Sequence, residues 1–371
     1  MLLWVAPRRS ALRRLLFQVH LWIGLAIGLV VSIVGLTGSI LVFKPELEAA
    51  LIPSLTRVTP GPQRVPIDQL VAVLKRDRPA YRITNLYVYG QPDLAWNFRT
   101  THQDGSRVQV YFDQYTGRIL GEDPFRDHWL DWIYDLHERL LAGRTGLTVN
   151  AIAAWLLVLM CLTGIIVWWP GQPHWRDGFR YHASASWKGQ NYDLHKLTGF
   201  SSALLLALVS ITGAYYAFPD AYRKTVAALT STPAAVVTPK SKPGPPRTAG
   251  IEQIYLNALA AMPEAEPHIL FFPSKPDGIF SLRMRLPGDW VRTGNHHVYL
   301  DQYSGAVIRP DYYHRRPLGA RIIGSNGPLH FGTVFGNSPR VLWVLLGLTP
   351  AALSVSGALM YWNRVWAKLR T

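Results

Sequence analysis

The segment VGLTGSILVF (34–43) decides the architecture of this chain, because a close copy of it, VSITGAYYAF (209–218), follows 175 residues later. A second apolar segment, LTGIIVWW (162–169), has its own copy, VSGALMYW (355–362), at an offset of 193 residues. Matches at fixed offsets and in the same order indicate an internal duplication. The chain is therefore predicted to consist of two related halves.

All four repeated segments belong to long stretches without Asp, Glu, Lys or Arg. A membrane-spanning helix needs about 20 mainly apolar residues, and each stretch is longer than that. Four transmembrane helices are therefore predicted. The uncharged stretches are Leu15–Phe43, Thr145–Trp175, Leu197–Pro219 and Val341–Asn363.

The basic residues of the chain, whose formal net charge is +15, cluster on one side of this topology. Short loops rich in Lys and Arg face the cytoplasm, so both termini and the loop between the second and third spans are predicted to be cytoplasmic. The two long connections then face outward. The residues that carry this orientation are Arg8, Arg9, Arg13, Arg14, Arg176, Arg180, Lys188, Lys196, Arg364, Lys368 and Arg370.

The two outer connections are predicted to be small α+β domains of one design. In the first, IDQLVAVLKRD (67–77) has apolar residues at helical spacing, and VYFDQYTG (110–117) is typical of a strand that ends in a turn. The second contains the matching segment VYLDQYSG (298–305). Asp113 and Asp301 are predicted to start these turns, which is a commoner role than a catalytic carboxylate pair.

The predicted fold class is an α-helical membrane protein in which the unit helix, outer α+β domain, helix occurs twice. Pro-rich composition marks residues 231–250 as an extended linker before the second outer domain. The predicted division is transmembrane helix 1 (15–43), first outer domain (44–136), transmembrane helix 2 with an interfacial lead-in (137–170), cytoplasmic loop (171–194), transmembrane helix 3 (195–219), second outer domain (220–329), transmembrane helix 4 with an interfacial lead-in (330–363) and cytoplasmic tail (364–371).

Four of the twelve histidines obey the repeat. His20 matches His195 near the cytoplasmic face, and His137 matches His330 near the outer face. Facing imidazoles in a helix bundle can hold a planar haem by two axial ligands, and ionisable residues within a membrane protein indicate a functional site. Helix capping or snorkelling would explain one such histidine, but four at equivalent positions favour ligation of haem iron. His20 is predicted to pair with His195, and His137 with His330.

Glycines follow each of these histidines at a fixed distance. Gly24 and Gly199 come four residues after His20 and His195, on the same helix face, where they would leave room for a macrocycle. Gly143 and Gly336 come six residues after their histidines, which is off that face and suggests a bend before the span. Plain helix packing is the alternative for such small residues.

The single cysteine, Cys161, lies within the second span. Disulfides and a C-x-x-C-H attachment site for covalent haem are therefore excluded.

These motifs resemble the PepSY-associated transmembrane-helix family. The resemblance covers nearly the whole chain, and its family includes ferric-siderophore reductases of the ferrioxamine-reductase type in the bacterial inner (cytoplasmic) membrane, which are di-haem proteins. It implies two non-covalent b-type haems. The predicted topology, and not the resemblance, assigns His20 and His195 to the inner haem and His137 and His330 to the outer one. The carrying segments are VHLWIGLAIGLVVSIVGLTGSILVF (19–43), LHERLLAGRTG (136–146), DLHKLTGF (193–200) and LHFGTVFGNSPRVLWVLLGLTPAALSVSGALMYW (329–362).

The resemblance also implies an oxidoreductase that carries electrons outward and reduces siderophore-bound Fe(III) in the periplasm, releasing Fe(II). The expected partners are the lipid bilayer, a ferric siderophore and an external electron donor, a quinol or a cytosolic reductant, because no G-x-G-x-x-G element is present; no nucleic acid is expected. Two alternatives stay open. One is a haem-free membrane-anchored module that binds peptides or regulates a protease, and the other is a siderophore or metal permease component. No catalytic side chain is identified.

Overall fold

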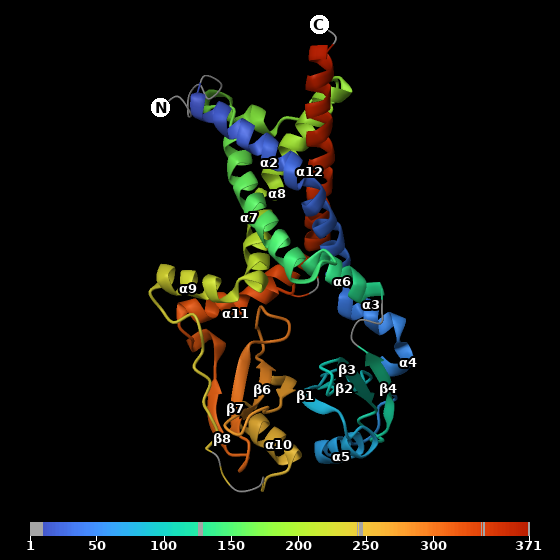
Figure 1. Ribbon diagram of the computed structural model, residues 1–371. Helices are drawn as coiled ribbons and strands as arrows, with labels where there is room; N and C mark the ends of the chain where they lie inside the picture. Colours follow the sequence, from blue (N-terminus) through green and yellow to red (C-terminus); the bar gives the residue numbers. More distant parts are fainter. Residues whose placement is uncertain are drawn as a thin grey trace.

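The computed structural model describes residues 10–124, 129–242, 244, 248–334, 336 and 338–369. A bundle of long helices forms one end of the molecule and a β-sheet the other, and both ends of the chain lie at the end away from the sheet (Figure 1). Arg8, Arg9, Arg370 and parts of the Pro-rich linker lie outside the described residues, as does the side chain of Lys368.

Four helices are long and apolar enough to cross a membrane, which confirms the predicted number of spans. Each of the predicted uncharged stretches lies largely within one of them. The four helices pack side by side in one bundle (Figure 1). They are α2 (Ala11–Leu41), α7 (Gly143–Trp168), α8 (Trp187–Ala217) and α12 (Ser338–Leu369).

Small residues let α2 and α12 approach closely. Gly35 and Gly347 face each other, and a methyl group on either one would collide with the backbone of the opposite helix. Beside them, the Ser39 hydroxyl donates to the Val344 carbonyl at 2.8 Å. Glycine and serine at a helix crossing allow this backbone contact inside a membrane, where hydrophobic attraction between helices is weak.

Each outer domain is a helix packed on a four-stranded antiparallel meander. The first contains α5 (Ile67–Asp77), β1 (Arg82–Tyr87), β2 (Trp96–Thr101), β3 (Arg107–Phe112) and β4 (Ile119–Pro124). The second contains α10 (Ile251–Ala261), β5 (Glu266–Phe271), β6 (Ile279–Arg285), β7 (His296–Asp301) and β8 (Val307–Asp311).

The two meanders join into a single eight-stranded sheet in the order β4-β3-β2-β1-β5-β6-β7-β8. The joint is the antiparallel pair β1–β5, in which Leu86 lies opposite Leu270. Both leucines belong to one buried core, which also contains the apolar faces of α5 and α10. The opposite face of the sheet is turned towards the bundle (Figure 1). It carries polar and aromatic side chains such as Tyr87, Gln109 and Tyr111.

The helices α5 and α10 cap each other's first turn. Asp68 of α5 accepts hydrogen bonds from the backbone N–H groups of Ile251 and Glu252, at 2.7 and 3.0 Å. In return, Glu252 of α10 accepts from the backbone N–H of Ile67 at 2.8 Å. The first N–H groups of a helix lack intrahelical partners, so these two carboxylates satisfy donors across the domain boundary.

Replacing Asp68 with Ala is therefore expected to lower the free energy of unfolding by about 1 kcal/mol, the usual cost of losing such a cap. The Glu252→Ala change should cost a similar amount. Chemical unfolding of the detergent-solubilised chain measures both. Asp77→Ala is the control, because that exposed carboxylate only pairs with neighbouring Arg76 and such pairs contribute little. Equal stability of all three variants would refute the capping role.

The two turn aspartates have the predicted structural role. The Asp113 carboxylate accepts from the backbone N–H of Tyr115 at 2.9 Å, and Asp301 accepts from Tyr303 and Ser304 at 3.0 and 2.9 Å. These bonds close the turns after β3 and β7, which confirms that both residues initiate turns.

Shorter helices connect the bundle with the sheet. Among them, α6 and α11 run ahead of the spans α7 and α12. Leu140, Leu141 and Gly143 have positive φ between α6 and α7, and Gly332 has φ +67 at the end of α11, so the chain turns sharply where the sequence predicts a bend. The connecting elements are α3 (Lys44–Leu51), α4 (Pro53–Thr56), α6 (Trp129–Arg139), α9 (Pro219–Thr230), α11 (Leu318–Phe331) and the 3-10 turns η2 (Gln172–Phe179) and η3 (Tyr313–Arg315).

Candidate functional site

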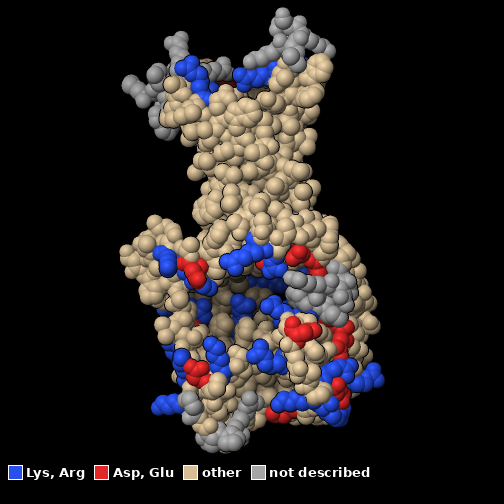
Figure 2. Space-filling model, viewed as in Figure 1, with Lys and Arg blue, Asp and Glu red and all other residues tan. Residues whose placement is uncertain are grey.

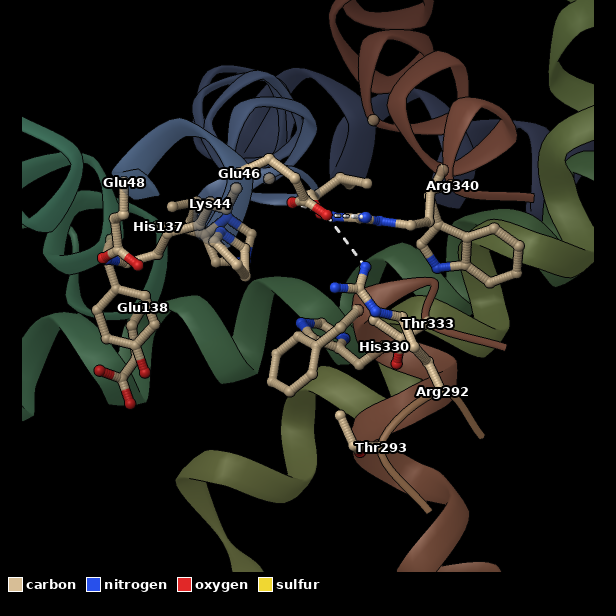
Figure 3. A pocket seen from close by; sticks show the side chains of 18 of the residues that line it. Lys44, Glu46, Glu48, His137, Glu138, Arg292, Thr293, His330, Thr333 and Arg340 are labelled. Atoms are coloured by element: carbon tan, nitrogen blue, oxygen red, sulfur yellow. Dashed lines mark hydrogen bonds and ion pairs between the residues drawn. The ribbon is translucent and has the colours of Figure 1, made fainter. Parts of the chain in front are cut away.

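The structure brings His137 and His330 together at the end of the bundle nearest the sheet. Their ring centroids are 6.2 Å apart and the ring planes are inclined by 52°. His137 comes from α6 and His330 from α11, the two helices that precede the spans α7 and α12. Both rings line one cavity (Figure 3). The two halves of the duplicated chain thus contribute one imidazole each.

The ring of His137 is held by a short segment of α2. Its Nδ1 lies 2.9 Å from the Val34 carbonyl oxygen and 3.2 Å from the Thr37 hydroxyl. A carbonyl only accepts hydrogen bonds, so Nδ1 carries the proton, and the neutral ring keeps its lone pair on Nε2. Gly38 adjoins the edge of the ring, since a Cβ there would lie 2.9 Å from Cε1.

His330 has the same surroundings on α8. Its Nδ1 lies 3.0 Å from the Val209 carbonyl oxygen and 3.3 Å from the Thr212 hydroxyl. A Cβ at Gly213 would approach the His330 ring to 2.9 Å. The Nδ1 nitrogen of this ring is also the donor, and Nε2 is again free to bind a metal.

The other two histidines repeat this arrangement at the opposite end of the bundle. His20 of α2 bonds through Nδ1 to the Thr163 hydroxyl of α7 at 3.1 Å, and a Cβ at Gly164 would lie 3.1 Å from its ring. The Thr163 hydroxyl itself donates to the Leu159 carbonyl at 2.8 Å, so it accepts from the imidazole. The Met160 carbonyl bonds to the same ring.

His195 of α8 has equivalent contacts on α12. Its Nδ1 lies 2.8 Å from the Ser356 hydroxyl, which donates to the Ala352 carbonyl at 2.7 Å. The Leu353 carbonyl bonds to the ring, and Gly357 adjoins it. His195 and His20 lie near each other at this end of the bundle. Each of the four rings therefore rests on a Thr or Ser, the glycine after it and the carbonyl three residues before it.

Sequence reasoning missed this supporting element, although the signal was present. One Thr-Gly or Ser-Gly dipeptide lies within each of the four apolar segments that define the repeat. Each dipeptide holds a histidine from another helix, so no spacing along one helix reveals the contact. The dipeptides are Thr37-Gly38, Thr163-Gly164, Thr212-Gly213 and Ser356-Gly357.

The four glycines chosen from sequence lie elsewhere. A Cβ at Gly24 would approach the Met160 side chain to 3.0 Å, and one at Gly199 would meet Leu353 at 3.6 Å. Gly143 and Gly336 have φ of +55 and +88 with open space around them, which suits turns before α7 and α12. None of these contacts involves a histidine ring, and a role in packing a macrocycle stays a prediction.

The two histidine layers are separated by most of the membrane. His195 and Gly213 lie 18 positions apart on α8, which corresponds to about 27 Å of helix rise. Gly213 touches the ring of His330, so this rise measures the distance between layers. The hydrocarbon core of a bilayer is about 30 Å thick. One pair of imidazoles therefore lies near each face.

A cavity of about 1310 Å³ connects the outer histidines with the sheet. Its bundle end is apolar, and its sheet end is aromatic and polar. The bundle end is lined by Val31, Gly35, Leu157, Leu206, Leu346 and Pro350, and the sheet end by Tyr87, Tyr89, Gln109, Tyr111, Glu266 and His268.

Buried Arg340 anchors the wall of this cavity. It is 1% exposed, lies over the Phe43 ring and bonds to Glu46 through both terminal nitrogens. Arg292, in the segment after β6, pairs with the same carboxylate at 3.0 Å. Glu46 thus joins α3, α12 and the second outer domain (Figure 3). These ion pairs, Arg340 first, lower the pKa of Glu46 to about 2.

The lowered pKa of Glu46 predicts a stability loss in acid. Because the folded state favours the carboxylate, its contribution is present above the ordinary pKa near 4.5 and is lost as pH falls from there towards about 2. The melting temperature of the native chain should therefore fall more on acidification than that of Glu46→Gln, by on the order of a few °C. Thermal melts in detergent across this range measure the difference. Parallel pH profiles would contradict the prediction.

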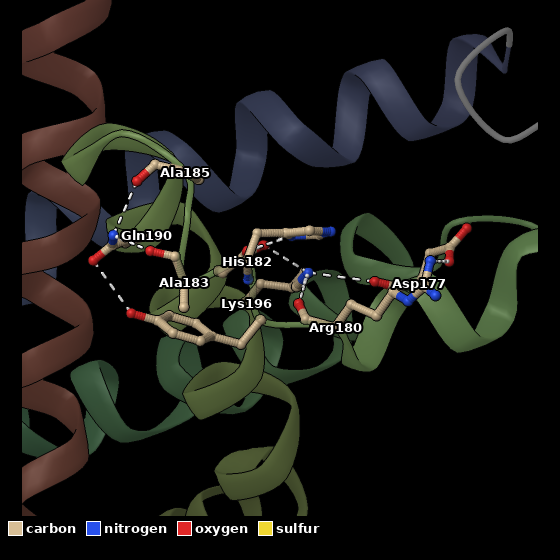
Figure 4. A network of polar contacts seen from close by, with 9 residues as sticks. Asp177, Arg180, His182, Ala183, Ala185, Gln190 and Lys196 are labelled. Atoms are coloured by element: carbon tan, nitrogen blue, oxygen red, sulfur yellow. Dashed lines mark hydrogen bonds and ion pairs between the residues drawn. The ribbon is translucent and has the colours of Figure 1, made fainter.

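A polar network closes the other end of the bundle (Figure 4). Asp193, two residues before His195, accepts from His182 Nδ1 at 2.7 Å and from Lys196 Nζ at 2.8 Å. Lys196 also donates to the Arg180 carbonyl at 2.9 Å. This network holds the loop between α7 and α8 against the start of α8, beside the inner histidines.

The residues at the outer histidine pair fit a haem, and the same anchoring of Nδ1 recurs at the inner histidines. A metal held linearly between two imidazole nitrogens, with bonds of about 2.0–2.1 Å, places the ring centroids roughly 6–7 Å apart, as in the outer pair. The anchored Nδ1–H groups direct the Nε2 lone pairs to ligation. The apolar bundle end of the cavity suits a flat apolar macrocycle. Two imidazoles match the axial ligation of haem iron, whereas structural zinc takes four protein ligands.

The fold and these paired histidines define a multi-pass helical membrane protein with an outer α+β domain pair. The family model described as PepSY-associated TM region matches residues 17–364. The chain belongs to this family. No curated protein matches the chain.

Proposed function

We propose that this protein is a di-haem b-type reductase of the bacterial inner membrane, which carries electrons outward and reduces the iron of a ferric siderophore in the periplasm. The observation that carries the proposal is the fourfold repetition of one imidazole setting, in two layers about 27 Å apart. Helix capping alone would not require the same hydroxyl, carbonyl and glycine around each ring.

The protein side of the chemistry is ligation and placement. His20 and His195 would hold the inner haem iron, and His137 and His330 the outer one. Each haem would supply one-electron redox chemistry within the bilayer. The Thr, Ser and carbonyl groups keep each Nδ1 protonated and each ring fixed, which raises the basicity of Nε2. Apolar residues of the bundle would surround the outer haem on its membrane side.

The cavity supports docking of the ferric complex next to the outer pair. Its 1310 Å³ volume exceeds the range of about 300–1,000 Å³ that is usual for small-molecule pockets. The gain of one electron converts Fe(III) to Fe(II), which binds hard oxygen donors more weakly and is released. With both termini in the cytoplasm, the inner pair would receive electrons there from a membrane quinol or a cytosolic reductant.

A redox-difference spectrum of the purified protein tests this function. The chain, produced with sufficient haem, should show a Soret band and contain two haems per molecule. After anaerobic reduction, a ferric siderophore should reoxidise both haems, and an Fe(II)-specific chromogenic chelator should detect one Fe(II) per haem.

Three outcomes would count against the proposal. Purified protein without a Soret band would favour a haem-free peptide-binding or protease-regulating module. Bound haem that no ferric siderophore reoxidises would leave an electron conduit with another acceptor. Uptake of the intact ferric complex into vesicles would instead favour a permease component.

A further inference from the structure

The sheet face that is turned towards the bundle carries a cluster of arginines at one side of the cavity. Arg283 and Arg285 project from β6 on the same face, because they are two positions apart on a strand. Arg292 follows in the next segment, and His268 of β5 lies among the three. Figure 2 shows Lys and Arg side chains gathered in and around the hollow between bundle and sheet. We call these three arginines the arginine cluster.

The arginine cluster is only partly neutralised. Arg283 donates to the neutral amide oxygen of Asn295 at 3.0 Å, and no carboxylate pairs with it among the described residues. Arg285 lies 3.6 Å from Glu266, whose side chain is 73% exposed. Arg292 shares the carboxylate of Glu46 with Arg340. The Nε groups of Arg283 and Arg285 are buried and have no hydrogen-bond partner.

The arginines contribute to lowered pKa values of two neighbouring histidines, His268 and His297. Burial, together with Arg283, Arg292 and Arg285, lowers the pKa of His268 to about 4. Burial, with Arg283 and Arg316, likewise lowers the pKa of His297 to about 3. Both rings are therefore neutral at pH 7 and add no positive charge themselves. The lining also contains the carboxylates of Glu46, Glu48, Glu138 and Glu266, so the excess of positive charge is local to Arg283 and Arg285 on β6. A local excess of positive charge beside low-dielectric walls attracts ligands of the opposite sign.

Aromatic side chains share the lining of the cavity with Arg285 and Arg292, and Arg283 lies on the same sheet face two positions before Arg285. Tyr87, Tyr89 and Tyr111 belong to its sheet end. The guanidinium of Arg99 lies over the Tyr87 ring at 5.1 Å. Tyrosine provides a rigid apolar surface with a polar tip, and arginine binds carboxylate or catecholate oxygens by paired hydrogen bonds.

We propose that the cavity selects iron chelates of net negative charge, with the arginine cluster as the selecting element. This inference rests on the proposed reductase function and names its substrate class. Reduction adds one electron from the external donor to the bound Fe(III) chelate, so the Fe(II) complex is one unit more negative, and the same arginines stabilise it. A complex with net positive charge would meet repulsion at Arg283 and Arg285.

Binding of redox-inert Ga(III) chelates tests the inference apart from electron transfer. Isothermal titration of the haem-loaded protein would compare Ga(III)–citrate and an anionic Ga(III) tris-catecholate with a Ga(III) trihydroxamate that carries a free ammonium group. At least one anionic complex should bind about tenfold or more tightly than the cationic one, and the advantage should shrink at high salt. The two anionic arms distinguish carboxylate from catecholate chelates.

Variants identify the selecting residues. Arg283→Gln and Arg285→Gln should each weaken binding of the anionic complex about tenfold, while Arg283→Lys should retain most of it. Arg118→Gln is the control, because Arg118 is exposed in the turn between β3 and β4 and does not line the cavity. Haem content and melting temperature identify any variant that misfolds.

The outcomes separate the inference from the proposed function. Equal or tighter binding of the cationic complex, or glutamine variants with native affinity, would overturn charge selection even if the protein reduces iron chelates. Selective binding of anionic Ga(III) chelates by a protein that reduces no Fe(III) chelate would overturn the reductase function and leave charge selection standing.

Discussion

The single substitutions His137→Ala and His330→Ala are expected to remove the same haem and to leave about half of the total. The reason is geometric: the two rings are 6.2 Å apart, one from each half of the chain, and a haem held between them loses an axial ligand in either variant. Reductase activity should fall to background in both, since electrons would no longer reach the outer face. Pyridine haemochrome assays and difference spectra measure the loss.

A second pair of histidine substitutions tests the inner site. His20→Ala and His195→Ala should remove the other haem and keep the outer one, so the residual spectra of the two classes of variant should sum to that of the native protein. His102→Ala is the matched control, because His102 lies in the β2–β3 turn of the outer sheet and should leave both haems in place. Loss of both haems from every single variant, or of none, would refute the pairing.

The general architecture could be predicted from sequence because it depends on local and repeated signals. Uncharged stretches of membrane length predict the spans, and a duplication at fixed offsets identifies the four candidate histidines among the twelve. The turns after α6 and α11 could also be predicted, because in a regular helix Gly143 and Gly336 would not lie on the face that carries the histidine.

Contacts between distant segments could not be predicted in this way. The pairing of β1 with β5 joins two separate modules. The sequence of neither strand indicates which strand of the other module will pair with it. The glycines show the same limit. Gly24 and Gly199 were selected because they share a helix with a histidine, whereas Gly38 and Gly213 touch histidines from other helices. A single sequence shows which residues share one face of a helix, but it does not show which other helix packs against that face.

The two ends of the outer cavity differ in how closely they follow the internal repeat. The bundle end is made of residues that follow the repeat, including both outer histidines and their glycines. The sheet end does not follow the repeat. The arginine cluster belongs to β6 and the segment after it, and the first half places Tyr87, Tyr89 and Tyr111 on the same face. In the proposed function, a symmetric frame for two haems would open into an asymmetric chamber for the ferric complex.

Filling the glycine position beside an outer histidine is expected to have nearly the effect of removing that histidine. A Cβ at Gly38 would lie 2.9 Å from Cε1 and 3.3 Å from Nδ1 of His137, closer than real Cβ contacts allow. Gly38→Val therefore has to push the ring away and break its bond to the Val34 carbonyl, so Nε2 no longer points at the iron position. Gly38→Val and Gly213→Val should each lose the outer haem and keep the inner one.

Gly199→Ala provides the comparison within the same membrane span as Gly213. A Cβ at Gly199 would meet only the Leu353 side chain at 3.6 Å, an ordinary contact, so both haems should remain. Loss of the inner haem from Gly199→Ala would instead support the macrocycle-packing role expected from sequence. If Gly38→Val and Gly213→Val keep the native haem content and spectrum, the supporting role of the Thr-Gly dipeptides is wrong, because a ring displaced by a branched side chain cannot keep the same ligation geometry.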